Sequence, residues 1–380
     1  MADRLADTIP LGQPTFGDEE LTAVAAVLRS GWVAGQGPTG RAFEQRFAAL
    51  CGSRHALAVN NCTAALHLVF AGYGAGPGDE VIVADYTFPA TGHAVMYTGA
   101  TPVFADVRPD IWTVEPAAAE AAITPRTVGI VAVDAFGQPA DYDELRVIAS
   151  RHGLWLVQDA ACSAGATYRG RPAGSLGDAA CFSFHGRKGI TSGEGGAITT
   201  DDDALAAKTR KLHFFGLDSA FARAGSSELP VPVFDELGYN YKLSEIAAAV
   251  VSVQLDRLPE LLRARHRVAA GYGELLGDLE QLVLPVQLAD RRTVWQSYVL
   301  TLSAGIDRGR VAGELRSRGI QCTFGTYASH VQPLYGDRPP CPVSADVFRR
   351  HLAIPMHANL TDAQVEIVAK AVREAVQQQA

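Results

Sequence analysis

Residues 129–160 read GIVAVDAFGQPADYDELRVIASRHGLWLVQDA. An apolar run at 129–133 leads into helical spacing over 141–152, and a second apolar run follows at 154–157. Continuous apolar strands separated by helices are typical of a mostly parallel sheet that is covered on both faces. The stretch therefore predicts a strand–helix–strand unit of an α/β protein, in which ligands bind beyond the carboxyl ends of the strands.

The same alternation continues on both sides of this unit, and acidic residues and glycines mark the expected starts and ends of helices. The further elements predicted for this part are strands at 81–84, 102–104 and 180–184 and helices at 18–31, 63–72, 90–98 and 116–123. Together these elements predict one large domain built around a sheet.

The pattern changes after about residue 255. A chain of 380 residues exceeds one ordinary core, so two domains are expected. The elements predicted beyond this point are a long helix at 255–272, a strand at 294–302, a helix at 308–318, a short strand at 321–324 and a capped helix at 361–379. We predict an N-terminal arm and large domain over 1–255 and a smaller α+β domain over 256–380.

Composition and charge exclude several classes of protein. Hydrophobic residues make up 48% and charged residues 19%, which excludes a mainly disordered chain. The net charge of −8 does not favour binding to the negatively charged backbone of nucleic acid. No apolar run reaches the roughly 20 residues that span a bilayer. The six cysteines show neither CxxC nor zinc-type spacing. We expect a cytoplasmic protein with reduced thiols and without a metal, nucleic-acid or membrane partner.

Asp159 and Lys188 are the first candidates for chemistry. Asp159 follows a predicted buried strand, where a carboxylate either caps a following helix or holds a positive charge at the edge of the sheet; taken alone, the position favours the cap. Lys188 leaves another strand and enters a glycine-rich loop that ends at Gly196. It is either a solvated charge or a nucleophilic amine, and the presence of only five lysines among 33 basic residues favours the amine.

The segment Asn60-Asn61-Cys62-Thr63-Ala64-Ala65 begins the helix predicted at 63–72. Free amides and a hydroxyl at a helix start bind anions, but simple capping by Thr63 is the better explanation when the segment is taken alone. The chain contains no GxxxxGK loop and no GxGxxG after a strand, so the usual nucleotide-binding loops are not expected.

An anion site, a buried acid and an isolated lysine together suit one cofactor, pyridoxal 5'-phosphate. This cofactor needs its phosphate held, its ring nitrogen protonated against a carboxylate and its aldehyde captured by a lysine amine. An aromatic side chain stacked on the ring completes such a site, and Phe88, which follows Tyr86-Thr87 at another strand end, can supply it.

Over nearly its whole length, the chain resembles the DegT/DnrJ/EryC1/StrS family of sugar aminotransferases, pyridoxal-phosphate enzymes of fold type I (aspartate aminotransferase-like). The resemblance rests on Ser30-Gly31-Trp32, residues 63–66, 76–83 and 99–104, Asp159-Ala160-Ala161, Phe182-Ser183-Phe184 with Lys188, residues 193–196, and Gly238-Tyr239-Asn240-Tyr241. It implies a large domain with a mostly parallel central sheet and a smaller C-terminal α+β domain.

The resemblance also implies roles for single residues. Lys188 would bind the cofactor aldehyde and shuttle a proton, Asp159 would pair with the ring nitrogen, and Phe88 would stack on the ring. The phosphate ligands would be Thr63, the Ala64 amide, Ser183 and Asn240, the last from the second subunit of a homodimer with shared active sites. The positions near the substrate would be Glu194, Lys242 and His330.

Two residues depart from the family pattern. Cys162 stands where the family usually carries Gln or His in the cofactor site, and a thiol forms weaker hydrogen bonds. Lys242 stands where the family often has arginine, so a point-like ammonium replaces a two-pronged guanidinium.

The resemblance implies transfer of an amino group from glutamate, with glutamine as the less favoured donor, to the ketone of a nucleotide-linked keto-deoxysugar. Residues 190–196 are similar to the branch that aminates C4, and amination at C3 or of an aminocyclitol ketone remains the alternative. A non-catalytic regulatory protein that binds pyridoxal phosphate is the alternative from another class. The presence of both Lys188 and Asp159 argues against it.

Overall fold

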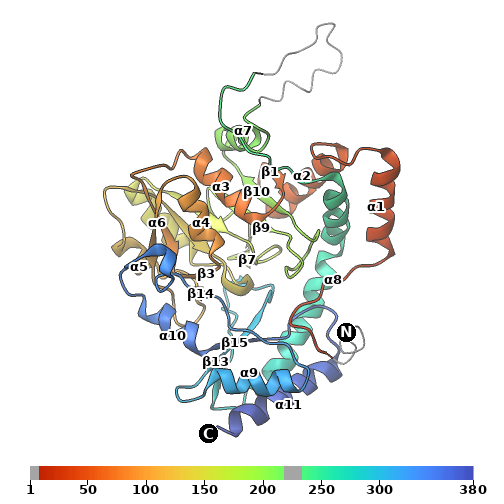
Figure 1. The fold of residues 1–380 in the computed structure, drawn as a ribbon, viewed down its shortest axis with the longest axis vertical. Coiled ribbons are helices and arrows are strands. Elements are labelled where there is room, and N and C mark those ends of the chain that lie inside the picture. The colour runs from red at the N-terminus through yellow and green to blue at the C-terminus, as the bar shows by residue number, and fades with distance from the viewer. Residues whose placement is uncertain (1–7, 218–232, 380) are drawn as a thin grey trace.

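The computed structural model describes residues 8–217 and 233–379 and is centred on a seven-stranded sheet (Figure 1). In the order β1-β10-β9-β6-β5-β2-β4, strands β4, β2, β5, β6 and β9 run parallel, whereas β10 is antiparallel to both of its neighbours. The strands are β1 (His55–Val59), β2 (Glu80–Ala84), β4 (Thr101–Ala105), β5 (Thr127–Val133), β6 (Trp155–Asp159), β9 (Ala179–Ser183) and β10 (Gly196–Thr200). The mostly parallel sheet confirms the predicted α/β fold class.

Helices cover both faces of this sheet because its strands are apolar at successive positions. Val81 and Val83 pack in one buried cluster with α3 and α4, whereas Ile82 and Ala84 pack in another with α5 and α6. This alternation is the two-residue period of a strand. The covering helices are α2 (Pro38–Cys51), α3 (Cys62–Gly72), α4 (Ala90–Tyr97), α5 (Pro116–Ala121), α6 (Tyr142–His152) and α7 (Asp203–Leu212).

Helix α8 (Glu245–Leu276) runs from the sheet-centred part to a second core (Figure 1). Its first half packs against α1 (Asp18–Ser30) and α2, and its second half against α11 (Asp362–Gln377). With α8 and α11, the second core contains α9 (Arg308–Ser317) and the antiparallel sheet β11 (Leu282–Val283), β13 (Tyr298–Leu302) and β15 (His351–Ile354). We call it the C-terminal core. The domain boundary at 255/256 stays a prediction, and in the structure this position lies inside α8.

Several predicted elements differ from the structure. The helix predicted at 255–272 begins ten residues earlier, because the Ser244 hydroxyl caps its start by accepting the Ala247 N–H at 3.2 Å. The strand predicted at 321–324 is wrong, since only Thr323 forms an isolated bridge, with Ala353. The sequence analysis missed α2, β1, β10 and β11. It also missed α10 (Pro342–Arg350), the pair β3 (Tyr86–Thr87) and β14 (Tyr327–Ala328), and the small sheet of β7 (Thr167–Tyr168), β8 (Arg171–Pro172) and β12 (Arg291–Arg292).

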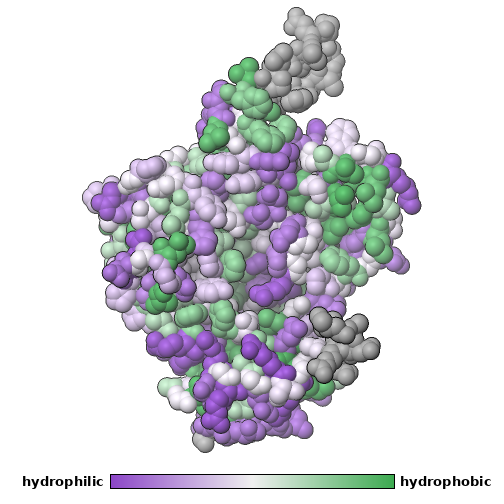
Figure 2. Space-filling model, viewed as in Figure 1, coloured by the Kyte–Doolittle hydropathy of each residue, from purple (hydrophilic) through white to green (hydrophobic). Residues whose placement is uncertain are grey.

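Helix α1 carries an exposed apolar face. It begins after Gly17 with three acidic residues and ends at Gly31, whose φ of 74° suits glycine. Figure 2 shows hydrophobic residues gathered over this helix. Its large exposed side chains and those on either side of it are Phe16, Leu21, Leu28, Trp32 and Val33, which are 41–69% exposed. Among the described residues, no helix combines the length and apolarity needed to cross a membrane.

Candidate active site

A cavity of about 900 Å³ opens at the carboxyl edge of the large sheet, where β5, β6 and β9 end beside the start of α3. The loop that follows β9 and the segment 323–327 complete its wall. The predicted site residues that line it are Thr63, Ala64, Phe88, Asp159, Cys162, Ser183, Lys188 and Glu194. The structure thus brings most of the predicted cofactor site together at one place.

Lys188 lies in the loop between β9 and β10, with its amine directed at the cavity wall. Its Nζ lies 3.2 Å from Cys162 Sγ, and its backbone N–H donates to the His185 carbonyl at 2.9 Å. Burial opposes protonation of this amine, but Cys162, Cys62 and Asp159 together raise the pKa of Lys188 above its ordinary value. The amine must therefore lose a proton before it acts as a nucleophile.

Asp159 is the last residue of β6 and is only 4% exposed. Its Oδ2 accepts the Thr91 hydroxyl at 2.7 Å and its Oδ1 accepts the Ala161 N–H at 3.1 Å. Burial raises the pKa of this carboxyl, and the two hydrogen bonds and Lys188 only partly offset the effect. No helix follows in residues 160–166, so the interpretation as a helix cap is wrong. Each oxygen has one protein donor and keeps room for a ligand.

The start of α3 differs in one detail from the sequence-based interpretation. Asn61, not Thr63, is the N-cap: its Oδ1 accepts the Ala64 N–H at 2.7 Å. The Ala64 amide predicted as a phosphate ligand is thus already engaged. Thr63 remains on the cavity wall, and across from it Ser183 Oγ at the end of β9 accepts the His185 N–H at 3.3 Å.

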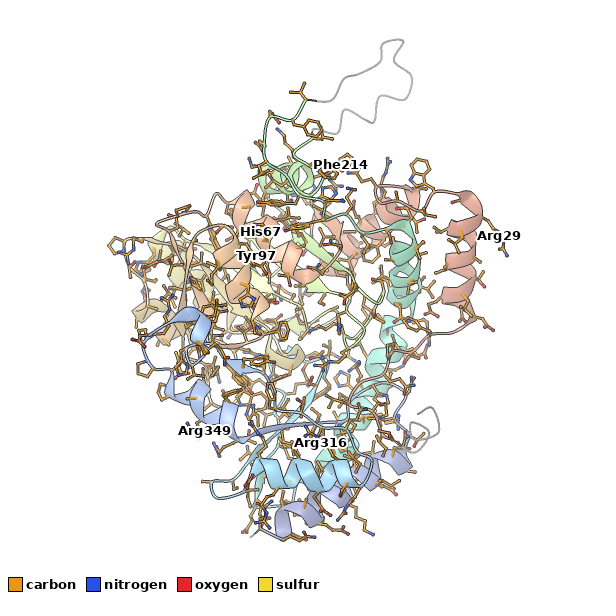
Figure 3. The ribbon with its side chains drawn as sticks, in the orientation of Figure 1. Arg29, His67, Tyr97, Phe214, Arg316 and Arg349 are labelled. Carbon is orange, nitrogen blue, oxygen red and sulfur yellow. The ribbon has the colours of Figure 1, made fainter. Side chains whose placement is uncertain are left out.

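Aromatic side chains line the outer part of the cavity. Phe88, directly after β3, is 65% exposed, and its ring centroid lies 6.1 Å from that of Tyr327 in an edge-to-face arrangement. Tyr97 on α4 faces His67 on α3, with ring centroids 5.5 Å apart (Figure 3). His67 Nδ1 lies 3.2 Å from the Tyr241 hydroxyl. Both Tyr97 and Tyr241 line the cavity. The sequence analysis assigned a role to neither, although Tyr241 belongs to the motif Gly238-Tyr239-Asn240-Tyr241.

Glu194 lies on the wall with a 70% exposed side chain, and its carboxylate lies 3.8 Å from His185 Nε2. Thr91, Asp134 and Gln296 also line the cavity, and sequence reasoning missed all three. Thr91 lies only three residues after Phe88 in the sequence, and this proximity was the signal that could have found it.

Three predicted residues lie outside the lining of this cavity. The Lys242 amine donates to Asn240 Oδ1 and lies 4.4 Å from the ring centroid of Phe214. Asn240 is exposed. His330 turns towards a buried carboxylate, with Nδ1 2.7 Å from Asp85 Oδ2 and its backbone N–H donating to Asp85 Oδ1 at 2.6 Å.

The groups around the cavity fit pyridoxal 5'-phosphate. A lysine amine suits its aldehyde, a buried carboxylate with an unfilled acceptor suits its ring nitrogen, and an exposed phenyl ring suits its flat face. Two hydroxyls beside the amino end of α3 suit its phosphate. The arrangement can therefore support amino-group transfer.

Comparisons with known proteins agree with this chemistry. The sequence model of the DegT/DnrJ/EryC1/StrS aminotransferase family matches residues 14–373. The spore coat polysaccharide biosynthesis protein SpsC of Bacillus subtilis (strain 168) is 36% identical over 378 residues, which cover 97% of each protein.

Solved structures are similar over the same length. DesI, solved in the presence of its TDP-sugar product, is 35% identical with a TM-score of 0.89, covering 100% of this chain and 98% of its own. Spr1654 of Streptococcus pneumoniae, solved in its PLP form, is 26% identical with a TM-score of 0.91, covering 98% of this chain and 100% of its own. The aminotransferase fold and the cofactor predicted from the sequence are confirmed.

Proposed function

Because the chain belongs to the DegT/DnrJ/EryC1/StrS aminotransferase family, whose cofactor is pyridoxal 5'-phosphate, we propose that this enzyme transfers an amino group from glutamate to the C4 ketone of a nucleotide-linked keto-deoxysugar. The observation that carries the proposal is the meeting of the Lys188 amine and the buried Asp159 carboxyl in one large cavity. Bound pyridoxal phosphate supplies an electron sink and carries the amino group from one substrate to the other.

Asp159 and Lys188 take the two proton-handling roles in this proposal. The Asp159 carboxylate holds the proton at the ring nitrogen, and Thr91 and Ala161 fix its orientation through one hydrogen bond to each oxygen. The Lys188 amine binds the aldehyde and afterwards moves a proton at Nζ. The contact of Nζ with Cys162 Sγ holds the amine in the cavity until then.

The remaining residues of the cofactor site bind the phosphate and shield the ring from water. Thr63 and Ser183 donate their hydroxyls to the phosphate beside the amino end of α3, and Phe88 covers one face of the ring and excludes water. The Ala64 amide joins them only if Asn61 releases it. Glu194, Lys242 and His330 are proposed to lie near the sugar nucleotide once a second subunit and the substrates are bound.

The choice of C4 rests on residues 190–196, the loop after Lys188, which are similar to the branch of the family that aminates C4. A nucleotide-linked sugar is further supported by DesI, which was solved with its TDP-sugar product. The donor and the ketone position are tested together in one assay. Purified enzyme is given glutamate, then keto-sugars linked to dTDP, GDP or UDP with the ketone at C3 or C4, or a keto-cyclitol.

Glutamate is expected to bleach the absorbance of the bound cofactor, and a C4 ketone to restore it with formation of the amino sugar. Amination of a C3 ketone or of the cyclitol alone would overturn the substrate assignment. Absence of any spectral change with amino donors would favour a regulatory protein. In the same assay, Lys188→Ala is the control: it must lose both the response and the borohydride-reducible attachment of cofactor.

We also propose a homodimer in which Asn240 reaches the partner's cofactor phosphate. The exposed apolar face of α1 and the exposed position of Asn240 support it. Two inactive variants, Lys188→Ala and Asn240→Glu, should then complement each other after they are unfolded, mixed and refolded. About a quarter of wild-type activity is expected, because half of the dimers carry one intact site of two. No recovery in proven heterodimers would place Asn240 in its own subunit's site or outside the phosphate site.

A further inference from the structure

Arg265 is a buried cation directly behind the lysine loop. It lies in α8, is 4% exposed, and its Nη2 donates to the backbone carbonyl of Lys188 at 3.2 Å. Its Nη1 donates to the carbonyls of Trp295, Gln296 and Met356 at 3.1, 3.3 and 3.4 Å. Among the described residues, these hydrogen bonds all end on neutral carbonyls, so the positive charge has no carboxylate partner.

The segments that Arg265 joins come from different parts of the fold. Trp295 and Gln296 precede β13 of the C-terminal core, and Met356 follows β15. Gln296 adds a second link, because its Nε2 donates to the Arg187 carbonyl at 3.1 Å. Two successive carbonyls of the lysine loop are therefore held from the side of the C-terminal core.

An uncompensated buried charge acts on the groups around it. Burial lowers the pKa of Arg265 to about 10, which leaves it protonated at neutral pH. The titratable groups facing it are Cys162, whose Sγ touches Lys188 Nζ, and His357, whose pKa is lowered to about 4 by burial and by Arg265. Those facing Lys188 are Cys162, Cys62 and Asp159.

We propose that Arg265 is a positioning residue for Lys188: its guanidinium fixes the backbone of the lysine against the C-terminal core and places a buried positive charge beside the lysine loop. A guanidinium suits both tasks, because its planar fork reaches four carbonyls and it stays charged when buried. The inference rests on the proposed role of Lys188, whereas the readout below requires no catalysis.

The test measures Lys188 directly. The chain has only five lysines, so selective ¹³C labelling of the lysine ε-carbons gives few signals, and Lys188→Arg identifies the one that belongs to Lys188. Titration of the cofactor-free full chain gives the pKa of the amine. In Arg265→Met, loss of the neighbouring positive charge should raise this pKa by about one pH unit. The holoenzyme should also lose cofactor at least about ten-fold faster in a chase with a cofactor scavenger.

Further variants separate geometry from charge. Arg265→Lys keeps the charge without the fork, so the pKa of Lys188 should stay near that of the wild type while cofactor loss remains fast. Arg265→Gln keeps donors without the charge and should raise the pKa as Arg265→Met does, which covers the case in which the methionine variant does not fold. Arg257→Met removes an arginine of the same helix that binds Glu20, and it should change neither quantity.

A pKa of Lys188 and a rate of cofactor loss equal to those of the wild type in Arg265→Gln would overturn the proposal. A different result is expected if Lys188 is not the residue that binds the cofactor aldehyde. In that case Lys188→Ala would keep its reducible cofactor, whatever the Arg265 variants show.

Discussion

Asp134 and Asp159 form a natural pair for comparison. They stand at the carboxyl ends of the neighbouring strands β5 and β6, both line the same cavity, and both are buried, at 0% and 4% exposure. In the sequence each follows an apolar run and precedes an alanine. Position and burial alone therefore do not distinguish them.

Their hydrogen bonds differ. Asp159 accepts one donor on each oxygen, whereas Asp134 accepts two on each. The donors to Asp134 are the Tyr142 hydroxyl at 2.7 Å, Gln158 Nε2 at 2.7 Å, the Ser163 hydroxyl at 2.5 Å and the Ala140 N–H at 3.2 Å. Protein donors occupy the acceptor sites of both Asp134 oxygens, so Asp134 ties strand ends together. Asp159 keeps acceptor sites that are free to receive a ligand. Unfilled acceptors, more than burial, mark the functional carboxylate.

The largest effect on the rate is expected from Asp159→Asn, which tests the difference between the two carboxyls. An amide does not stabilise a protonated ring nitrogen, so the first half-reaction with glutamate should slow roughly a thousand-fold, about 4 kcal/mol, with cofactor still bound. Stopped-flow absorbance measures the rate, and Asp134→Asn is the matched control with little change. A near-normal rate in Asp159→Asn would remove the distinction between the two carboxyls.

The second prediction concerns stability and pH at Asp134. Burial raises its pKa from 3.8 to about 6, although Ser163, Gln158 and Tyr142 donate to it. Between these values the unfolded chain releases the proton while the folded protein keeps it, so this carboxyl lowers the free energy of unfolding as pH rises, by about 3 kcal/mol in all.

Asn does not titrate. The free energy of unfolding of Asp134→Asn, measured relative to that of the wild type, should therefore rise by about 3 kcal/mol as the pH is raised from about 4 to 7. Urea unfolding at several pH values measures the difference, from which all other titrating groups cancel. A difference independent of pH would show that Asp134 ionises as easily in the folded protein as in the unfolded chain.

The smallest effect is expected from Thr91→Val, which removes the donor to Asp159 Oδ2 with little change of shape. We expect roughly ten-fold slower amino transfer, about 1.4 kcal/mol, with the KM for glutamate unchanged. Thr91→Ser should restore the rate. Thr87→Val removes the neighbouring hydroxyl, 3.1 Å from that of Thr91, and should leave the rate intact if the contact with Asp159 is what matters.

The sequence predicts the architecture well where a local pattern decides it. Unbroken apolar runs gave the parallel strands, and Gly31 ended α1 where predicted. Lys188 and Asp159 were found because one is rare in this chain and the other follows a strand, and the fold brings both to one cavity.

What the sequence did not predict depends on contacts between distant residues. The hydrogen bonds that occupy the Asp134 oxygens come from Tyr142, Gln158 and Ser163, which converge from separate elements. Arg265 looks like any polar position of a helix until its four carbonyl partners are known. The short pair β3 and β14 joins segments 240 residues apart, and neither segment has a strand-like period of its own.

Ile9, near the start of the sequence, is held by hydrogen bonds to residues far along the chain. It is buried in the C-terminal core, its N–H donates to the Gly319 carbonyl at 2.9 Å, and its carbonyl accepts the Gln321 N–H at 3.0 Å. The side chain of Gln321 also accepts the N–H of Leu11, 310 positions earlier. During synthesis the amino-terminal side of each such pair leaves the ribosome long before its partner exists. The large sheet can assemble in the meantime, and we expect the C-terminal core to form later, once these remote segments meet.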